Sequence, residues 1–459
     1  MKKLIVAIGV ALGVFTFGCS DNSNDTSALF GAPSSLTIVP NATPEGAAGE
    51  IRTLTFRVTM TEPQSGPVNI TYQTIPGTAT ENQDYLSAAG EITIPPNAIE
   101  GSINIELIGD AEEELAETFT LQISTSDNAT PTETEVVGTI ANDDTACDKP
   151  FSNEPNPWLV QGADPLNFAH RGGVRDFPEN TLYAYAKAAQ AGADVLEMDV
   201  YQTKDGELII LHDLNVDRTT NGQGNVVDLT LAELRELDAA YWFVQGEGTP
   251  HDRPDADYTF RGIATGEKSP PTGYSASDFR IPTLEDALAR FPHKLLNLEL
   301  KPDQDGVGNY EQQMAELLQR YGRSTNVIAA SFVDEAANNF KAVAPCVYSS
   351  VPFAQAFGLL AIFQSTGAFP PVPEHISFQA PPDTSQIGDQ IPGDAAIPLA
   401  TKELVDASHD ANLGVQVWTI NSCEEMLRMI DLKVDGIMTD EVLLLEKILA
   451  TPPEERTCD

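Results

Sequence analysis

Three acidic residues in the second half of the sequence are placed where they could hold a divalent cation. Glu197 and Asp199 stand two residues apart in the apolar run 195–200, so in a strand both carboxylates point to the same face. Glu299 lies near the end of a later apolar run, 295–300. Carboxylates that converge repel one another, and a hard cation removes the conflict. We therefore expect Glu197, Asp199 and Glu299 to hold Ca²⁺ or Mg²⁺.

Two histidines and two basic residues accompany these carboxylates. His170 directly precedes Arg171, and Lys301 follows Glu299 by two residues. Histidine is the side chain that most often transfers protons in catalysis, whereas Arg and Lys bind phosphate groups. We expect Arg171 and Lys301 to bind a phosphate. His170 and His212 are the candidates for proton transfer, and the motif series described below favours them through its family resemblance.

The chain just before His212 predicts where this histidine lies. A three-residue connection, Lys204-Asp205-Gly206, separates the candidate strands 195–203 and 207–212, and so short a connection favours a β-hairpin. With the last two of these residues at the centre of the turn, Asp199 pairs with His212. Paired residues have Cβ atoms about 4.5–5.5 Å apart. The hairpin therefore predicts that His212 lies beside Asp199.

The same residues belong to a longer series of short motifs. The series includes Ala169-His170-Arg171-Gly172-Gly173, Pro178-Glu179-Asn180-Thr181, Glu197-Met198-Asp199, His212-Asp213, Asn297-Leu298-Glu299-Leu300-Lys301 and Trp418-Thr419-Ile420-Asn421. In order, spacing and residue types it resembles the glycerophosphodiester phosphodiesterase family over most of 166–450. The resemblance implies metal-dependent hydrolysis of glycerophosphodiesters, such as glycerophosphocholine or glycerophosphoethanolamine, to glycerol 3-phosphate and an alcohol. Trp418, at a strand end, is expected either to cover the glycerol side of the site or to pack in the core.

Short apolar runs alternate with helical segments from residue 167 onward. This alternation is typical of a TIM barrel. Helices are predicted over 181–191 and 229–237. The candidate strands are 168–170, 195–200, 207–212, 295–300, 327–332, 347–351, 376–379, 415–420 and 436–439. Because nine candidates compete for eight places, one strand of the hairpin is expected to be an antiparallel partner outside the barrel.

The segment 36–144 alternates β-rich runs with turns, which predicts an all-β sandwich. Gly77-Thr78-Ala79-Thr80, Gln83-Asp84-Tyr85, Glu117-Thr118-Phe119 and Asn142-Asp143-Asp144 resemble a Calx-beta domain. In that family, loop carboxylates can bind calcium, and clustered oxygen donors suit this ion. The resemblance thus implies a possible second calcium site from Glu45, Asp84, Asp110, Glu114, Asp143 and Asp144. The alternative is a spacer or adhesive module.

Two further segments organise the second half. Residues 145–165 are rich in Pro, Asn and Asp and are expected to be a linker before a barrel at 166–455. The segment 238–280 resembles the insertion that family members use to shape the pocket, and a loop of this length is usually functional or disordered. We expect it to form a cap that contacts substrate.

The first nineteen residues predict export. Two lysines precede an apolar run too short to span a membrane, which is typical of a signal peptide (1–19). The run ends at Cys19, and a polar tether follows (20–35). This resembles a bacterial lipoprotein signal, which implies lipidation of Cys19 and a membrane-anchored protein facing the periplasm or the cell exterior. Thr16 departs from the usual pattern and leaves plain secretion as the alternative.

Export would place the remaining four cysteines, Cys147, Cys346, Cys423 and Cys458, where disulfides can form. Four cysteines allow three pairings, and the sequence does not choose among them. One option joins Cys147 to Cys458 and so closes the two ends of the barrel. Free or buried thiols are the other possibility.

The formal net charge of −42 argues against a nucleic-acid partner, because such a surface repels a polyanion. The expected partners are a small glycerophosphodiester and a membrane, through the lipid anchor. A lipid-directed phospholipase on the same barrel, similar to sphingomyelinase D, is a second enzymatic hypothesis. A calcium-dependent surface adhesion protein with an inactive barrel is the non-enzymatic one.

Overall fold

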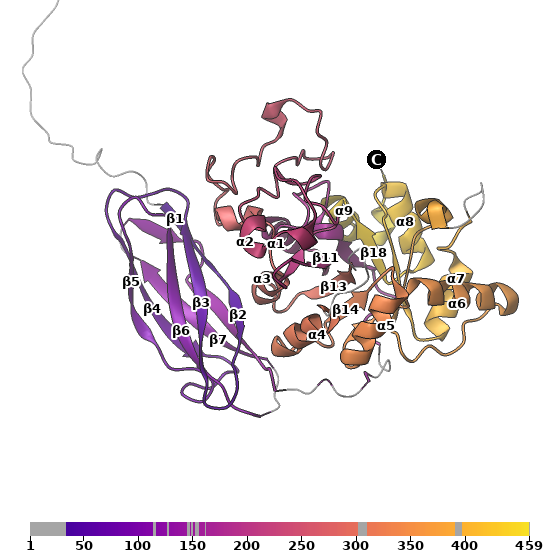
Figure 1. Ribbon diagram of the computed structural model, residues 1–459, viewed down its shortest axis with the longest axis horizontal. Helices are drawn as coiled ribbons and strands as arrows, with labels where there is room; N and C mark the ends of the chain where they lie inside the picture. The colour runs from indigo at the N-terminus through magenta and orange to yellow at the C-terminus, as the bar shows by residue number, and fades with distance from the viewer. Residues whose placement is uncertain are drawn as a thin grey trace, which may run out of the picture.

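The computed structural model describes residues 34–112, 116–125, 128–144, 147, 150–151, 156–160, 162–301, 310–390 and 397–458. An N-terminal β-sandwich lies beside a C-terminal α/β barrel (Figure 1). The predicted signal peptide with Cys19, most of the predicted tether, and Glu114 lie outside the described residues.

Two sheets form the sandwich, as predicted. The first has the order β6-β3-β1-β8, and the second has the order β2-β9-β7-β4-β5. Inward residues of both sheets, such as Phe56, Ile105 and Phe119, are fully buried and alternate with exposed polar neighbours. The strands are β1 (Ser34–Val39), β2 (Asn41–Pro44), β3 (Ile51–Met60), β4 (Val68–Pro76), β5 (Ala89–Ile94), β6 (Glu100–Ile108), β7 (Glu117–Thr125), β8 (Ala129–Pro131) and β9 (Glu135–Ala141).

Eight parallel strands form the predicted barrel. They are β10 (Leu166–Ala169), β11 (Val195–Gln202), β13 (Leu295–Leu300), β14 (Val327–Ala330), β15 (Tyr348–Ser349), β16 (Ser377–Ala380), β17 (Gly414–Val417) and β18 (Gly436–Thr439). Each pairs with the next along the chain, β10 pairs with β18, and a parallel bridge between Ser350 and Ser377 joins β15 to β16. The barrel is therefore closed.

Nine α-helices accompany the described strands of the barrel region. The ends of helix α1 follow from its sequence. It starts after Thr181, whose side chain accepts a hydrogen bond from Ala184 N, and it stops at Gly192, which has a left-handed backbone conformation. The helix predicted over 229–237 is only one turn long, capped by Thr230. The helices are α1 (Leu182–Ala191), α2 (Leu231–Leu234), α3 (Leu284–Arg290), α4 (Tyr310–Arg320), α5 (Asp334–Val343), α6 (Phe353–Thr366), α7 (Lys402–Asp410), α8 (Cys423–Leu432) and α9 (Val442–Ala450).

The predicted hairpin exists, but its register differs by one residue. Strand β12 (Leu208–Ile210) runs antiparallel to β11 outside the barrel order, with Tyr201 opposite Ile209. The turn has three residues between Thr203 and Glu207, with Gly206 at φ 87°, rather than two. Asp199 consequently lies opposite Leu211 and not opposite His212.

Part of the segment predicted as a linker, residues 156–160, packs against the barrel. Trp158 is 1% exposed and lies in an apolar cluster with Phe168, Val195 and Ile376 at the start of barrel strands. Asn156 donates two hydrogen bonds, to the backbone oxygens of Ile376 and Asn412. The buried Trp158 makes this part of the chain contribute to the barrel core.

Direct contacts join the sandwich to the barrel region. Arg57 on β3 donates to both carboxylate oxygens of Asp278, at 3.0 and 2.8 Å, and Asp278 is only 1% exposed. Strand β2 packs against α3 (Figure 1). The Thr139 Oγ1 atom lies 3.2 Å from His293 Nε2. The domains are therefore docked and not merely tethered.

The cysteines pair differently from the option raised above. Cys147 is bonded to Cys346, and Cys423 is bonded to Cys458. The first bridge fixes the start of the interdomain segment to the barrel next to β15. The second fastens the C-terminal tail to α8.

Candidate active site

The three predicted metal ligands lie together at the carboxyl end of the barrel. One ligand oxygen each from Glu197, Asp199 and Glu299 lies within 4.8 Å of the others. The parallel register between β11 and β13 places Asp199 directly beside Glu299. No other group of three metal-binding side chains this close occurs in the part of the chain that is described.

The electrostatics of this cluster favour a cation. Burial, and then the negative charge of Asp199, raise the pKa of Glu197 well above its usual value. Burial likewise raises the pKa of Glu299, against the opposing effect of Lys301. Burial would also raise the pKa of Asp199, but Lys301 and Arg171 outweigh it and hold this pKa well below its usual range. A divalent cation fits this donor set, because it would compensate the charge that burial penalises.

The residues after β10, 170–173, form a tight turn that brings Arg171 to the three-carboxylate cluster. Arg171 has a left-handed φ of 52°, and its backbone N–H donates to Glu197 Oε2 at 2.7 Å. Gly172 has φ 86°, and a Cβ there would meet the Ala184 Cβ at 2.8 Å, so only glycine fits. The Arg171 Nε then lies 3.4 Å from Asp199. Local sterics thus require glycine at position 172 of this turn.

Lys301 is the second cation of the cluster. Its Nζ lies 2.7 Å from Glu299 Oε1 and 3.3 Å from Asp199 Oδ1. Burial lowers the pKa of Lys301, but the two carboxylates more than offset this and raise it above its usual value. Arg171 and Lys301 therefore remain positively charged at the mouth of the barrel, as a phosphate-binding role requires.

His170 is held by a carboxylate that the sequence analysis did not single out. Its Nδ1 donates to Asp440 Oδ1 at 2.6 Å, directly after β18, and Asn421 donates to Asp440 Oδ2 at 2.7 Å. Burial raises the pKa of Asp440, but the hydrogen bond from His170 outweighs it, so this pKa falls below its usual value. The ionised carboxylate fixes the ring and leaves Nε2 to face the cavity.

His212 has a separate partner. Its Nδ1 donates to Asp213 Oδ1 at 2.6 Å, while Arg218 contacts Asp213 Oδ2 at 2.5 Å. Arg218 also donates to both oxygens of buried Glu179, at 2.7 and 2.8 Å. The two histidines therefore have matching Nδ1 hydrogen bonds but different supporting networks, since Asp440 has a neutral amide where Asp213 has a guanidinium.

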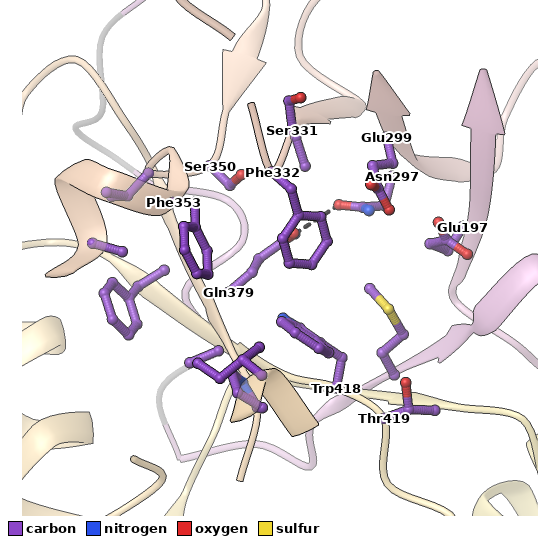
Figure 2. Close-up of a pocket in the computed structure, with 18 of the residues that line it drawn as sticks. Glu197, Asn297, Glu299, Ser331, Phe332, Ser350, Phe353, Gln379, Trp418 and Thr419 are labelled. Carbon is purple, nitrogen blue, oxygen red and sulfur yellow. Dashed lines mark hydrogen bonds between the residues drawn. The ribbon is translucent and has the colours of Figure 1, made fainter. Parts of the chain in front are cut away.

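Both histidines open onto one cavity of about 220 Å³. Glu197 and Glu299 line it on one side (Figure 2). Arg171 and Lys301 also line this cavity. Apolar side chains form the other side, where Figure 2 shows Trp418, Phe332 and Phe353. Trp418 is thus at the cavity and not only in the core.

The family comparison agrees with this geometry. The glycerophosphoryl diester phosphodiesterase family matches residues 170–444, more than half of the chain. The chain belongs to this family. The Calx-beta domain family matches residues 47–145.

Two similar curated proteins are named glycerophosphodiester phosphodiesterase, and a solved phosphodiesterase structure is also similar. A glycerophosphodiester phosphodiesterase of Caldanaerobacter subterraneus is 32% identical over 60% of this chain and 94% of its own length. That of Bacillus subtilis is 29% identical over 62% of this chain and 86% of its own. The solved structure of an Oleispira antarctica phosphodiesterase, in complex with the product sn-glycerol-3-phosphate, is 23% identical and covers 62% of this chain and 96% of its own, with a TM-score of 0.43. The chain is a phosphodiesterase of this class.

The structure adds supporting residues to the phosphodiesterase site. Asn180, with φ 54°, donates to Asp199 Oδ2 at 3.1 Å and accepts from the Tyr185 hydroxyl at 2.6 Å. Gln379 donates to Asn297 Oδ1 at 2.6 Å across the barrel (Figure 2). Asp440 and Gln379 each stand at or just past the end of a predicted strand, which is the one sequence signal that could have identified them.

The insertion does not cover the phosphodiesterase cavity as expected. None of the described residues that line the cavity comes from 238–280. Instead, Thr249 and the ring of His251 contact Arg218, and Asp278 binds the sandwich through Arg57. The segment therefore supports the network behind His212 and the domain interface, while α6 and its neighbours cover the cavity.

Most of the described carboxylates predicted for a second calcium site accept hydrogen bonds from backbone N–H groups or from side chains. Asp143 accepts from Gly46 N at 3.1 Å and from Arg52 at 3.3 Å. Asp110 accepts from Glu112 N at 2.7 Å, and Asp84 accepts from Thr80 N at 2.5 Å. Burial, and then its acidic neighbours Asp143 and Asp110, raise the pKa of Asp144. Glu45 is buried nearby, with Asn142 at 3.4 Å. Calcium binding here stays a prediction.

Proposed function

We propose that this phosphodiesterase hydrolyses glycerophosphodiesters, such as glycerophosphocholine or glycerophosphoethanolamine, to glycerol 3-phosphate and an alcohol. One observation carries the proposal: a single cavity holds two histidines, each hydrogen-bonded through Nδ1 to its own aspartate, beside a three-carboxylate cluster and two cations. This arrangement supplies a proton acceptor, a proton donor and positive charge for one phosphodiester.

Glu197, Asp199 and Glu299 would hold a divalent cation, Ca²⁺ or Mg²⁺, which supplies positive charge to the phosphate oxygens when bound. Arg171 Nε already lies 3.4 Å from Asp199 Oδ2, and Lys301 Nζ lies 2.7 Å from Glu299 Oε1. A phosphate group would give both basic side chains an alternative anionic partner, so they orient the diester as well as neutralise it.

The histidines move the protons. With Nδ1–H donated to an aspartate, a neutral ring accepts a proton at Nε2, and a protonated ring donates one there. One histidine takes the proton of the attacking hydroxyl group while the oxygen of that hydroxyl forms a bond to phosphorus. The bond from phosphorus to the leaving alcohol breaks, and the other histidine protonates that alcohol. The family resemblance favours the glycerol 2-hydroxyl as the first nucleophile, with water then opening the cyclic phosphate as the two histidines exchange roles.

A direct assay tests this function. Purified full-length protein is incubated with glycerophosphocholine, and choline and glycerol 3-phosphate are measured before and after chelation and after addition of Ca²⁺ or Mg²⁺. We expect release of both products, loss on chelation and recovery with one or both metals. Turnover that survives exhaustive chelation would contradict the metal, and no turnover under any condition would contradict the substrate.

We also propose that the protein is exported and held at a membrane through lipidated Cys19. The signal-like N-terminus and a lipoprotein-type cysteine support this, as do two disulfides in the described chain. No helix in the described ranges has both the length and the apolar character to cross a bilayer. Cys19→Ser should move the protein from the membrane to the soluble fraction. A wild type that is already soluble would overturn the anchor.

A further inference from the structure

Two amide side chains inside the cavity take no part in the chemistry proposed above. Gln379 on β16 donates to Asn297 Oδ1 on β13 at 2.6 Å, and both residues line the cavity (Figure 2). Asn297 is only 2% exposed. Their mutual hydrogen bond leaves Asn297 Nδ2 as a donor and Gln379 Oε1 as an acceptor, and neither atom has a partner within the described chain. Because buried amides are normally fully hydrogen-bonded, this amide pair should receive a group of the substrate.

The kind of group follows from what the amide pair offers. A hydroxyl accepts and donates at once, so it can accept from Asn297 Nδ2 and donate to Gln379 Oε1. The quaternary ammonium of choline has no hydrogen to donate, and the ammonium of ethanolamine has no lone pair with which to accept. An ionised phosphate oxygen only accepts. The amide pair therefore matches a hydroxyl, and not the nitrogen of either head group or the phosphate.

The position of the amide pair selects the glycerol half of the substrate. Asn297 lies beside Glu197 in the strand register and two residues before Glu299, so it stands roughly 7 Å deeper in the barrel than Glu299. The other end of the cavity is aromatic and open, with Phe332 41% exposed. A diester held by its phosphate between these ends points one substituent toward each. Head groups vary in size and need the open end, whereas the glycerol is constant and fits the enclosed polar end.

We propose that Asn297 and Gln379 bind the terminal hydroxyl of the glycerol and so make the site selective for fully deacylated glycerophosphodiesters. The proposal rests on the glycerophosphodiester activity proposed above and names the residues that select its substrate. The glycerol is then held at both ends, by its phosphate and by its terminal hydroxyl, and the 2-hydroxyl between them stays free to attack phosphorus. An acyl group on the terminal hydroxyl removes the hydrogen that Gln379 accepts and adds bulk at the enclosed end.

A set of three substrates tests the selectivity of the wild-type, full-length enzyme. The phosphocholine ester of propane-1,2-diol keeps the attacking hydroxyl but lacks the terminal one, and hexanoyl lysophosphatidylcholine, used below its micelle-forming concentration, has that hydroxyl esterified. For each compound kcat/KM should be at least about 10²-fold below that of glycerophosphocholine, because the buried amide pair is left incompletely bonded. A value close to that of glycerophosphocholine for either compound would overturn the role of the amide pair and leave the proposed function intact. No hydrolysis of glycerophosphocholine would instead refute the proposed function.

A matched pair of variants locates the selectivity. Gln379→Met removes one amide with little change in volume, whereas Gln416→Met makes the same change at the neighbouring position of β17, where the side chain is fully buried and does not line the cavity. The ratio of kcat/KM for glycerophosphocholine over the propanediol ester should fall at least about 10-fold in Gln379→Met and stay within about 2-fold in Gln416→Met. A ratio separates selectivity from stability, since a weakened fold lowers both rates alike. If Gln379→Met slows both substrates equally, the amide pair only supports the barrel and the assignment is wrong.

Discussion

Two acidic clusters were predicted as metal sites, one in each domain, and the structure builds them differently. Glu197, Asp199 and Glu299 stand on two paired strands, so the sheet register forces their side chains together. In the sandwich, Asp84 and Asp110 bind backbone N–H groups within their own loops. The barrel carboxylates also have hydrogen-bond or ion-pair partners, but one oxygen from each comes within 4.8 Å of the others, and no three metal-binding side chains of the described sandwich do the same. The position of an acidic residue within an element therefore says more than its number of acidic neighbours.

The largest effect should come from the barrel cluster. Glu197→Gln, Asp199→Asn or Glu299→Gln should each lower kcat at least about 10³-fold, because each removes charge that binds the cation and, through it, the phosphate. Bound metal, measured by elemental analysis, should fall together with kcat. Glu207→Gln, on an exposed residue of the same hairpin, serves as the control. A variant that keeps full metal content but loses activity would break the proposed ligand set.

The histidines come next. His170→Ala and His212→Ala should each lower kcat at least about 10²-fold, which is the usual minimum for loss of an acid or base. His409 is a useful control, because its Nε2 contacts Asp435 at 2.8 Å, outside the residues that line the cavity. His409→Gln should leave kcat within about 2-fold of wild type. Near-normal turnover by either cavity variant would contradict its role.

The aspartate partners should matter less than the rings they hold. Asp440→Asn and Asp213→Asn should lower kcat about 10- to 10²-fold with little change in KM, because they orient the histidines and do not touch substrate. Each loss also removes a negative charge beside an imidazolium. A rise in KM as large as the fall in kcat would instead indicate that these aspartates help to bind the substrate.

The domain interface should affect stability and not chemistry. Arg57→Ala leaves the buried Asp278 carboxylate without its main cation, which should cost about 2 kcal/mol of unfolding free energy. The exposed pair of Arg235 with Asp286 provides the comparison, and Arg235→Ala should cost less than about 1 kcal/mol. Denaturant unfolding measures both. If Arg57→Ala lowers the free energy of unfolding no more than Arg235→Ala does, the contact between the two domains contributes little to stability.

The smallest effect on turnover should come from the sandwich cluster. Asp110→Asn and Asp143→Asn should leave glycerophosphocholine hydrolysis within about 2-fold of wild type. If calcium binds there, these variants should also lose calcium-dependent thermal stabilisation, as expected when an ion binds only the folded state. A large loss of turnover would show that the two clusters are coupled through the interface.

The sequence predicted the site correctly where residues with a chemical role lie within a clear strand pattern. The runs 295–300 and 436–439 match β13 and β18, and the paired spacing of Glu197 with Asp199 predicted a shared face correctly. The hairpin count failed by one residue because a three-residue turn and a two-residue turn look alike in sequence. Periodicity alone cannot specify which of several turn lengths the backbone adopts.

Contacts between residues that are far apart in the chain could not be predicted from the sequence. Trp158 sits in a stretch with loop composition, yet it is buried beneath the barrel. Asp440 lies far along the chain from His170, and only barrel closure brings them to 2.6 Å. The apolar residues by which α6 lines the cavity, Phe353, Ala356, Phe357 and Leu360, have the spacing of an ordinary core-facing helix, so the sequence alone does not show that they border a cavity. Each of these depends on which distant segment occupies the neighbouring space.

The Cys147–Cys346 bridge also determines how the protein would respond to proteolysis. A cut between Cys147 and β10 would open the backbone between the two domains, yet the sandwich would stay covalently attached through the disulfide. Enzyme held on a membrane by its N-terminus would then not be shed by such a nick alone. Release of the catalytic half would require reduction as well as cleavage, so a nicked sample should run as one species on a gel without reductant and as two with it.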